Sequence, residues 1–223
     1  MSERGGNRKG TGRTFAVCFC GGSGIAYGIR LVDVLLHGGH RVHLTATKAA
    51  LKVLRHEAQA PVDPERPDLG VLFAEPVRGR LAVHDVAAVE AAPSSGSAGI
   101  EATVLIPCSM GTLARVAHGF STNLVERAGD VALKEGRPLI VVPRETPLSA
   151  VHLRNMLALA EAGAVILPAM PGFYHRPRTV EDLVDFVVAK VLDRLSVPHE
   201  LVARWTTPRE GDPAGSPWNE GEE

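Results

Sequence analysis

Three short apolar runs, each followed by a polar turn and then a helical pattern, constrain the fold of this chain more than any other feature. They are Thr14–Cys20, 102–107 and 139–142. Nearly continuous apolar strands of this kind are typical of parallel sheets that are covered on both faces. Strands and helices also alternate along most of the sequence. We therefore predict an α/β protein, a Rossmann-like or flavodoxin-like three-layer fold with a mostly parallel sheet.

The remaining elements follow from apolar spacing and from turn residues. Further strands are expected at 41–45, 81–83 and 165–167, and the stretch 60–79 is expected to be an irregular loop. Helices are expected at 25–36, 49–56, from 112 to about 118, 123–135, 149–162 and from Thr179 onward. Ser149 is suited to cap its helix, and Thr179 with Asp182 forms a pattern like a capping box.

The length of 223 residues is sufficient for one sizeable core. We expect a single folded domain at 14–205. Residues 1–13 and 206–223 are polar and rich in glycine, charge or proline, and we expect both segments to be disordered tails.

Composition excludes several classes of protein. The net charge of −1 does not favour a nucleic-acid partner, and no apolar run is long enough to span a membrane. Glycines follow the basic N-terminus where a signal peptide needs an apolar core, so we expect a cytoplasmic protein. The 3 cysteines and 9 histidines show neither a disulfide framework nor the spacing of a metal site. We interpret Cys18, Cys20 and Cys108 as buried strand residues.

Two turns with glycine and hydroxyl residues suggest a ligand site. Gly21, Gly22, Ser23 and Gly24 follow the first apolar run and precede a helix. Backbone N–H groups at such a turn favour an anion, but a tight turn that binds nothing explains this feature equally well. A second such turn is formed by Ser109, Met110, Gly111 and Thr112. Two turns in one sheet favour a ligand with a phosphate and other polar groups, such as a mononucleotide.

Several charged residues are candidates for the same site. Arg144 and Glu145 follow Pro143 at a strand end, where open α/β sheets bind ligands, although a surface ion pair is an equally simple explanation. Arg127 and Lys134 lie two helical turns apart, and Lys190 borders the apolar stripe of the last helix. Solvated helix charges are the alternative interpretation of these three residues.

These segments together resemble the UbiX family of flavin prenyltransferases. The resemblance extends from about Thr14 to Trp205. Its most specific parts are Arg-Glu-Thr-Pro-Leu at 144–148 and Phe-Tyr-His-Arg-Pro at 173–177. Weaker matches are Gly-Gly-Ser-Gly at 21–24, Ser-Ser-Gly-Ser at 94–97, Pro-Cys-Ser-Met-Gly-Thr at 107–112 and His-Leu-Arg-Asn-Met at 152–156.

The resemblance implies a flavoprotein that transfers a dimethylallyl group from dimethylallyl phosphate to reduced FMN without a metal. The product, prenylated FMN, would serve a UbiD-type decarboxylase. A homododecamer with active sites at subunit junctions is also implied. Which decarboxylase receives the product, and whether the donor is the monophosphate or the diphosphate, stays open.

The resemblance also assigns residues to roles. For FMN it implies Gly21, Gly22, Ser23, Thr47, Ser109, Met110, Gly111, Thr112 and Arg127. For the prenyl phosphate it implies Lys134, Arg144, Tyr174 and Lys190, with Glu57 and Trp205 as further substrate contacts. Glu145 would be the acid/base residue, with Lys134 and Arg144 also catalytic because cations stabilise a leaving phosphate.

Two alternatives stay open. An FMN-dependent cysteine decarboxylase would share the fold, and His56 imitates its catalytic histidine, but the later Asn-containing, Met-rich motif of those enzymes has no counterpart. A non-catalytic flavin-binding subunit is the second alternative. Retention of the cations and of Glu145 argues against it.

Overall fold

The computed structural model describes residues 12–63 and 67–202. They fall into two compact units, which divide between Ala169 and Met170 and are described separately. Most of the expected tails, and the candidate Trp205, lie outside the described residues. No helix in the described part of the chain is long and apolar enough to cross a membrane.

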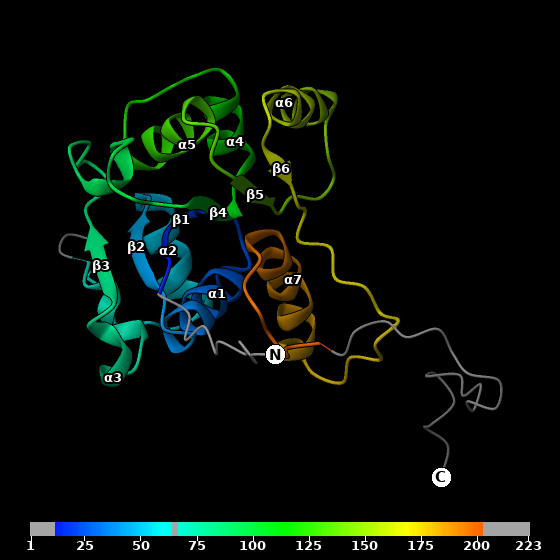
Figure 1. Cartoon of the computed structure of the whole chain (residues 1–223). Coiled ribbons are helices and arrows are strands. Elements are labelled where there is room, and N and C mark those ends of the chain that lie inside the picture. Colours follow the sequence, from blue (N-terminus) through cyan, green and yellow to red (C-terminus); the bar gives the residue numbers. More distant parts are fainter. Residues whose placement is uncertain (1–11, 64–66, 203–223) are drawn as a thin grey trace, which may run out of the picture. The chain divides into compact units, whose positions relative to one another are not determined.

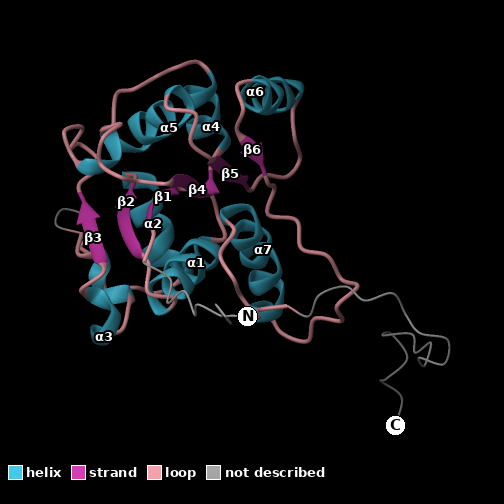
Figure 2. Ribbon diagram, in the orientation of Figure 1, coloured by secondary structure: helices cyan, strands magenta, loops and turns pink. Residues whose placement is uncertain are grey.

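The first unit is built on a six-stranded, all-parallel sheet with the strand order β3-β2-β1-β4-β5-β6 (Figures 1 and 2). The strands are β1 (Thr14–Cys20), β2 (Arg41–Ala46), β3 (Leu81–His84), β4 (Ala102–Cys108), β5 (Leu139–Pro143) and β6 (Val165–Ile166). This order confirms the predicted fold class, and it is the order of the Rossmann fold.

Helices cover both faces of this sheet. The helices of the first unit are α1 (Ile25–His37), α2 (Lys48–Glu57), α3 (Glu75–Arg78), α4 (Met110–Ala117), α5 (Leu124–Lys134) and α6 (Ala150–Glu161). Figure 1 shows α1 and α2 on one face and α4, α5 and α6 on the other. From β1 the chain adds β2 and β3 on one side and then returns to add β4, β5 and β6 on the other side. The strand order therefore reverses between β1 and β4, and α1 and α4 lie on opposite faces of the sheet.

The stretch 60–79 contains more structure than the expected irregular loop. A short 3₁₀ helix covers Leu69–Leu72, and α3 follows it. The Asp68 carboxylate accepts a hydrogen bond from the Gly70 N–H at 2.9 Å and starts the first of these turns. Pro76 stands in the first turn of α3, where the missing N–H costs nothing. These one-turn elements depend on single residues and leave no periodic pattern in the sequence.

The expected cap of α6 is confirmed. The Ser149 hydroxyl accepts from the His152 N–H at 3.2 Å, and the His152 ring accepts in return from the Ser149 N–H at 3.3 Å. β5 ends at Pro143, which has no N–H to extend a ladder. The five residues 144–148 that join Pro143 to this cap carry Arg144 and Glu145 at the end of β5.

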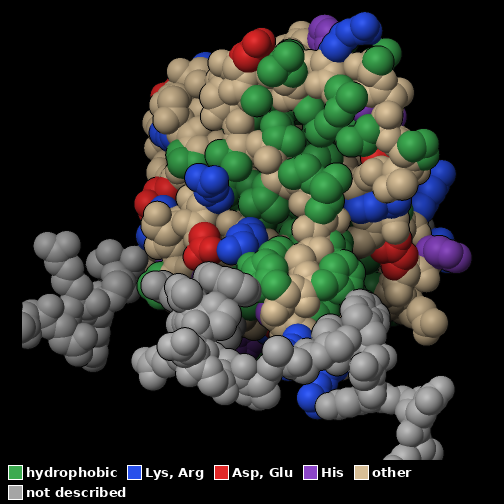
Figure 3. All heavy atoms as spheres, turned by 90° about the vertical axis from the view of Figure 1, so that its right-hand side faces the viewer, with side chains coloured by type: hydrophobic (Ala, Val, Ile, Leu, Met, Phe, Trp, Pro, Cys, Tyr) green, Lys and Arg blue, Asp and Glu red, His purple; other side chains and the backbone are tan. Residues whose placement is uncertain are grey.

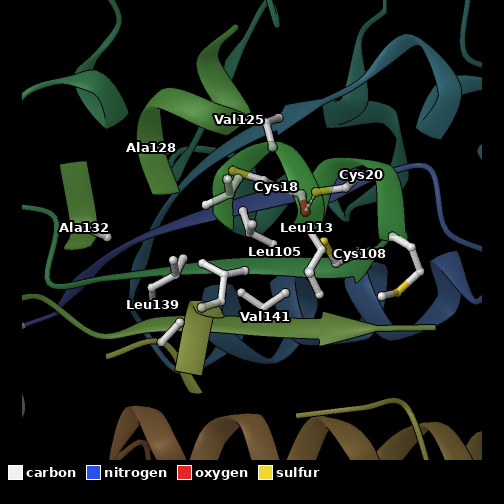
Figure 4. Packing of buried hydrophobic residues seen from close by; sticks show 14 residues of the cluster. Cys18, Cys20, Leu105, Cys108, Leu113, Val125, Ala128, Ala132, Leu139 and Val141 are labelled. Carbon is white, nitrogen blue, oxygen red and sulfur yellow. Dashed lines mark hydrogen bonds between the residues drawn. The ribbon is translucent and has the colours of Figure 1, made fainter. Parts of the chain in front are cut away.

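The core between the sheet and the α4/α5 layer contains all three cysteines (Figure 4). Cys18, Cys20 and Cys108 are free and buried, as predicted. Burial raises the pKa of Cys18 to about 12, with a smaller contribution from Cys108. Burial also raises the pKa of Cys20, and because the thiolate is the reactive form, the Cys18 and Cys20 thiols are structural rather than nucleophilic.

The second unit contains one helix, α7 (Val180–Leu195), within its described residues. The predicted capping box is confirmed: the Thr179 hydroxyl accepts from the Asp182 N–H at 3.1 Å, and the Asp182 carboxylate accepts from the Thr179 N–H at 3.0 Å. The hydrogen bonds to the Thr179 and Arg178 N–H groups lower the pKa of Asp182. This cap fixes where α7 begins.

Gly28 allows α1 to approach the sheet closely. A β-carbon at this position would lie 2.5 Å from Cε1 of Phe19 and 2.8 Å from the carbonyl oxygen of Ile106. Both neighbours are fully buried, so neither has room to move aside. The contact between α1 and the two central strands therefore depends on glycine.

We expect Gly28→Ala to lower the free energy of unfolding by about 1–3 kcal/mol, because the added methyl group overpacks the core. Gly79→Ala is the matched control, since a β-carbon there meets nothing within 4 Å. Urea unfolding monitored by circular dichroism measures both variants. Equal midpoints for Gly28→Ala and the wild type would contradict the proposed packing.

Candidate functional site

The carboxyl ends of β1, β2, β4 and β5 form one edge of the sheet, and hydrogen bonds link the segments that leave it. The Thr47 N–H donates to the Phe19 carbonyl at 2.9 Å, and the Arg144 N–H donates to the Cys108 carbonyl at 3.2 Å. Gly21 forms a bridge with Cys108. Both glycine turns, Thr47 and Arg144 therefore lie along this edge, beside the reversal of strand order where Rossmann folds bind ligands.

The first turn requires glycine at its start. Gly21 has a φ of 75°, a conformation that favours glycine. A β-carbon there would lie 2.6 Å from Cβ of Ala49. At Gly22, an added β-carbon would lie 3.3 Å from the Cys108 carbonyl group. Glycine thus brings this turn close to both α2 and the end of β4.

The N-terminus of α1 is already occupied by an anion from within the chain. The Glu57 carboxylate, at the end of α2, accepts hydrogen bonds from the Gly24 N–H at 2.8 Å and from the Ile25 N–H at 3.0 Å. The favourable end of the helix dipole is thereby satisfied. A phosphate at this turn cannot use these two N–H groups while Glu57 holds them, which the sequence did not indicate.

Glu57 is electrostatically connected to Arg144. Burial raises the pKa of the Glu57 carboxyl, but hydrogen bonds from Ser23, Ile25 and Gly24, together with the Arg144 charge, outweigh burial and lower the pKa overall. The Arg144 Nε also donates to the Ser23 carbonyl oxygen at 3.3 Å. The structure thus brings together Ser23, which the resemblance assigns to FMN, and Glu57 and Arg144, which it assigns to the prenyl substrate.

The second turn presents backbone and hydroxyl groups rather than its methionine. Ser109 caps α4 by accepting from the Thr112 N–H at 3.4 Å, and its hydroxyl bonds the Thr112 hydroxyl at 3.1 Å. The Met110 side chain is buried in the core cluster. Gly111 is exposed, and a β-carbon there would meet no atom within 4 Å. Contact between this turn and a flat ligand would therefore involve Gly111 and the hydroxyl groups.

A cavity of about 710 Å³ lies beside Thr47. Thr47 caps α2, and its sequence neighbours Ala46 and Lys48 both line the cavity. The other lining residues are Leu51, Pro67, Asp68, Leu69, Val83, His84, Asp85, Val86 and Ala87. Its volume is in the range of small-molecule sites, and its wall combines apolar side chains with a few charged ones.

His84 in the cavity wall is held by a second histidine. Its Nε2 lies 2.8 Å from Nδ1 of His43 on the neighbouring strand, and the two rings are nearly parallel. Burial lowers the pKa of both imidazoles, and for His43 the His84 charge adds to this effect. Neutral imidazoles can share one proton across this contact.

Arg127 lies in the first turn of α5, at the same edge of the sheet as the two turns. Its Nη1 donates to the Ser121 hydroxyl at 3.5 Å. The preceding loop is fixed by Glu126, whose buried carboxylate accepts from the Thr122 N–H and hydroxyl, each at 2.8 Å, and pairs with Arg115. Glu126 thus stabilises the loop that carries the partner of Arg127.

Lys134 lies near the amino ends of the strands, whereas Arg144 lies at their carboxyl ends. It ends α5 and precedes β5, whereas Arg144 follows the far end of β5. Five strand residues span roughly 16 Å. The Nζ of Lys134 lies 3.3 Å from Oε1 of its neighbour Glu135. One chain therefore does not bring Lys134 together with Arg144.

Glu145 lies beside Arg144 at the site edge, half-buried. Its Oε1 accepts a hydrogen bond from the Thr146 N–H at 3.1 Å. This bond holds the carboxylate at the start of the 144–148 segment. The carboxylate keeps further lone pairs for a proton or a ligand.

In the second unit, Phe186 connects Tyr174 and Lys190. The Tyr174 ring meets the Phe186 ring edge to face at 5.5 Å, and the Lys190 Nζ lies 5.6 Å from the centre of the same ring. His175 stacks on Phe186 at 5.1 Å. The two predicted prenyl-phosphate residues are thus neighbours across one aromatic side chain.

Sequence reasoning missed several residues of this region. Phe186 was not part of the apolar stripe expected for the last helix, although its position four residues before Lys190 puts both on one helix face. Lys48, His84 and Asp85 line the cavity without belonging to a motif. Within 12–63 and 67–202, no group of three or more His, Cys, Asp or Glu residues is placed to hold a metal ion.

The strand order, the two glycine turns beside its reversal and the cavity at the same edge define a nucleotide-binding α/β protein of the Rossmann type. The chain belongs to the Flavoprotein family, whose model matches residues 4–192, and within it to the flavin prenyltransferases named UbiX. The UbiX of Halalkalibacterium halodurans is 47% identical over 88% of this chain and 95% of its own length.

Solved structures agree with this assignment. The crystal structure of AnUbiX in complex with FMN and dimethylallyl pyrophosphate is 36% identical, has a TM-score of 0.79, and is matched over 89% of this chain and 100% of its own. A dodecameric FMN-dependent UbiX-like decarboxylase from Escherichia coli O157:H7 is 39% identical, with a TM-score of 0.77 over 87% of this chain and 100% of its own. The FMN-dependent cysteine decarboxylase TvaF, 21% identical with a TM-score of 0.51 over 69% of this chain and 88% of its own, shares the fold alone.

Glu126 generates a testable pH dependence. Burial raises its pKa, but hydrogen bonds from Arg115 and Thr122 lower it more, to about 2 from its usual 4.5. A depressed carboxyl pKa stabilises the fold above pH 4.5, and the stabilisation is lost as the pH falls toward 2.

We expect Glu126→Gln to lose about 3 kcal/mol of unfolding free energy at neutral pH, and this deficit to shrink steadily below pH 4.5. Urea unfolding between pH 7 and pH 3 measures the difference from the wild type. Glu101→Gln, which breaks a surface pair with Arg13, is the control and should change little. A deficit independent of pH would refute the electrostatic explanation.

Proposed function

We propose that the protein joins a dimethylallyl group to reduced FMN and releases prenylated FMN, without a metal. The observation that carries this function is the match to AnUbiX, whose crystal structure holds FMN and dimethylallyl pyrophosphate and which this chain covers completely. The cysteine decarboxylase alternative has only a fold-level likeness in its support. The specific segments 144–148 and 173–177 favour the prenyltransferase.

The residues present at the site edge fit FMN. The open space above Gly111 leaves backbone accessible to a flat ring system, while Gly21 and Gly22 let the first turn pack closely against α2 and β4 beside it. Thr47, Ser109, Thr112 and Ser23 supply hydroxyl groups along the same edge, and Arg127 adds a cation. Because Glu57 holds two N–H groups of α1, we assign the FMN phosphate to hydroxyl groups and Arg127 rather than to that helix end.

Reduced FMN supplies an electron-rich ring that accepts the five-carbon unit. The chain's own cations act on the phosphate leaving group. Arg144, Lys134 and Lys190 stabilise the negative charge that develops on the phosphate as its bond to the allylic carbon breaks. The Tyr174 ring offers a π face to the positive charge on the allylic fragment. The Glu145 carboxylate would act as the base for the proton released from the flavin ring when the new carbon–carbon bond closes.

Lys134 requires a second subunit in this scheme. It lies at the far edge of the sheet from Arg144, so its phosphate-binding role is possible only across a subunit junction. A related chain from E. coli is dodecameric, and we assign the same assembly to this protein. Each active site would then combine Arg144 and Glu145 of one chain with Lys134 of another.

We also propose a UbiD-type decarboxylase as the recipient of the product. Prenylated FMN is useful only to an enzyme that binds it as a cofactor. Dimethylallyl phosphate is the assigned donor, and the diphosphate is the alternative because AnUbiX was crystallised with it. The three free thiols fit a reducing compartment, so we retain the cytoplasm as the expected location.

The direct test mixes the purified protein anaerobically with reduced FMN and dimethylallyl phosphate and identifies the flavin by mass spectrometry. We expect a flavin heavier by one five-carbon unit. Glu145→Gln should lower product formation by at least 100-fold, the scale of a lost acid/base residue, while FMN binding is unchanged. If neither the monophosphate nor the diphosphate yields product with the wild type, the proposed reaction is wrong.

Subunit complementation tests the divided site. We expect Lys134→Ala and Arg144→Ala each to abolish prenylation, because each removes a cation from the leaving phosphate. Subunits of the two variants, dissociated and reassembled together, should regain part of the activity, since some junctions then contain both native residues. Each variant reassembled alone is the control. Failure of the verified mixed oligomers to regain activity would place both residues in one chain's site.

A further inference from the structure

The chain folds back on itself where α7 ends. Ser196 adopts the left-handed conformation, with a φ of 53°, and its N–H donates to the Asp193 carbonyl at 3.1 Å. A left-handed residue at this position turns the chain away from the helix axis. The turn returns His199 to the last turn of α7, where its ring lies beside the Asp193 side chain.

The Asp193 carboxylate holds two partners, one on each oxygen. Its Oδ1 lies 3.2 Å from Nε2 of His199, and its Oδ2 lies 3.9 Å from Nζ of Lys190, one helical turn earlier. The second contact is longer than a hydrogen bond, so the ammonium group keeps its N–H donors for other acceptors. The same ammonium group lies 5.6 Å from the centre of the Phe186 ring. An aromatic side chain and a carboxylate therefore both attract the Lys190 charge.

The His199 ring is fixed in one orientation. Its side chain is only 12% exposed, and its Nδ1 is buried without a hydrogen-bond partner among the described residues. A proton on Nδ1 would be buried and unpaired, which is costly. The neutral ring therefore carries its proton on Nε2 and donates it to Asp193. His199 thus holds one carboxylate oxygen while the other faces Lys190.

This arrangement differs from an ordinary ion pair at the surface. Figure 3 shows acidic and basic side chains lying next to one another on the exterior of the protein. Exposed pairs of that kind contribute little, because solvent screens the charges and both side chains are mobile. In the pair with Lys190, a largely buried ring restrains the carboxylate. Only the lysine then remains to be ordered.

We propose that Asp193 and His199 position Lys190 for the phosphate of the prenyl donor. This inference rests on the proposed function, in which Lys190 and Tyr174 bind that phosphate. A lysine carries its charge on a flexible stem, so it gains more than an arginine from neighbours that direct it. Asp193 acts on the phosphate only through Lys190, and His199 only through Asp193. Both are positioning residues rather than catalytic ones.

Simple repulsion predicts the opposite effect of Asp193. A carboxylate beside Lys190 repels a phosphate, so loss of its charge would strengthen donor binding if charge alone mattered. Positioning predicts weaker use of the donor, because Lys190 regains the conformational freedom of its side chain. The direction of the change therefore separates the two explanations.

Steady-state kinetics of prenylation measure that direction. We expect Asp193→Asn to lower kcat/KM for dimethylallyl phosphate about threefold to fivefold, the scale of a partly exposed ion pair, while the KM for reduced FMN stays unchanged. Glu181→Gln is the matched control, since it removes the same charge in the first turn of α7, roughly 18 Å away along the helix. It should leave both values unchanged. An equal or higher kcat/KM for Asp193→Asn would overturn the proposal.

A double-mutant cycle tests whether Asp193 acts through Lys190. We expect Lys190→Ala to lower kcat/KM for the donor by about tenfold or more, and Asp193→Asn to have no further effect in that background. Additive losses would overturn the proposal.

His199 provides the second comparison. His199→Leu should match Asp193→Asn, whereas His199→Gln, whose amide can still donate to Asp193, should lose less. Circular dichroism verifies that each variant is folded. Wild-type values for a folded His199→Leu variant would remove His199 from the proposal. Product from the wild type with an unaltered kcat/KM for Lys190→Ala would overturn this inference and leave the proposed reaction intact, whereas absence of product with either donor would refute both.

Discussion

The parallel direction of all six strands is the constraint on which the site depends. Because every strand ends at the same edge, segments distant in sequence become neighbours there without any long excursion of the chain. The reversal of order between β1 and β4 sends α1 and α4 to opposite faces, so the two glycine turns diverge at the position where Rossmann folds bind ligands. The Gly28 contact keeps α1 against the central strands and so fixes one side of this opening.

The Glu57 carboxylate changes how this edge handles charge. In many Rossmann proteins the first helix end binds the ligand's phosphate. Here two of its N–H groups are bound by Glu57, which in turn lies within the field of Arg144. Under the proposed function, recognition of a ligand phosphate would therefore fall to side chains rather than to these two N–H groups of α1. Such side chains can come from several elements, or from a second subunit.

The sequence was sufficient to predict the parts of the fold that depend on residues close together in the chain. The apolar strands and the caps at Ser149 and Thr179 each follow from residues a few positions apart. The pairing of Glu57 with α1 does not, because it joins residues 32 and 33 positions apart through a helix end. α3 was missed because a helix of four residues is too short to show a repeating apolar pattern. Phe186 was missed because it lies outside the expected apolar stripe, and its contacts with Tyr174 and His175 join residues from a loop that has no periodic pattern.

Lys134 is incomplete as a ligand in the single chain. It lies at the amino end of β5, whereas Arg144 and Glu145 follow the carboxyl end of the same strand. As a surface residue Lys134 costs the monomer little, because its charge is exposed and paired with Glu135. In the assembly proposed above, Lys134 of one chain would complete the charge around a phosphate that Arg144 of another chain binds. Assembly and completion of the phosphate site would then be one event.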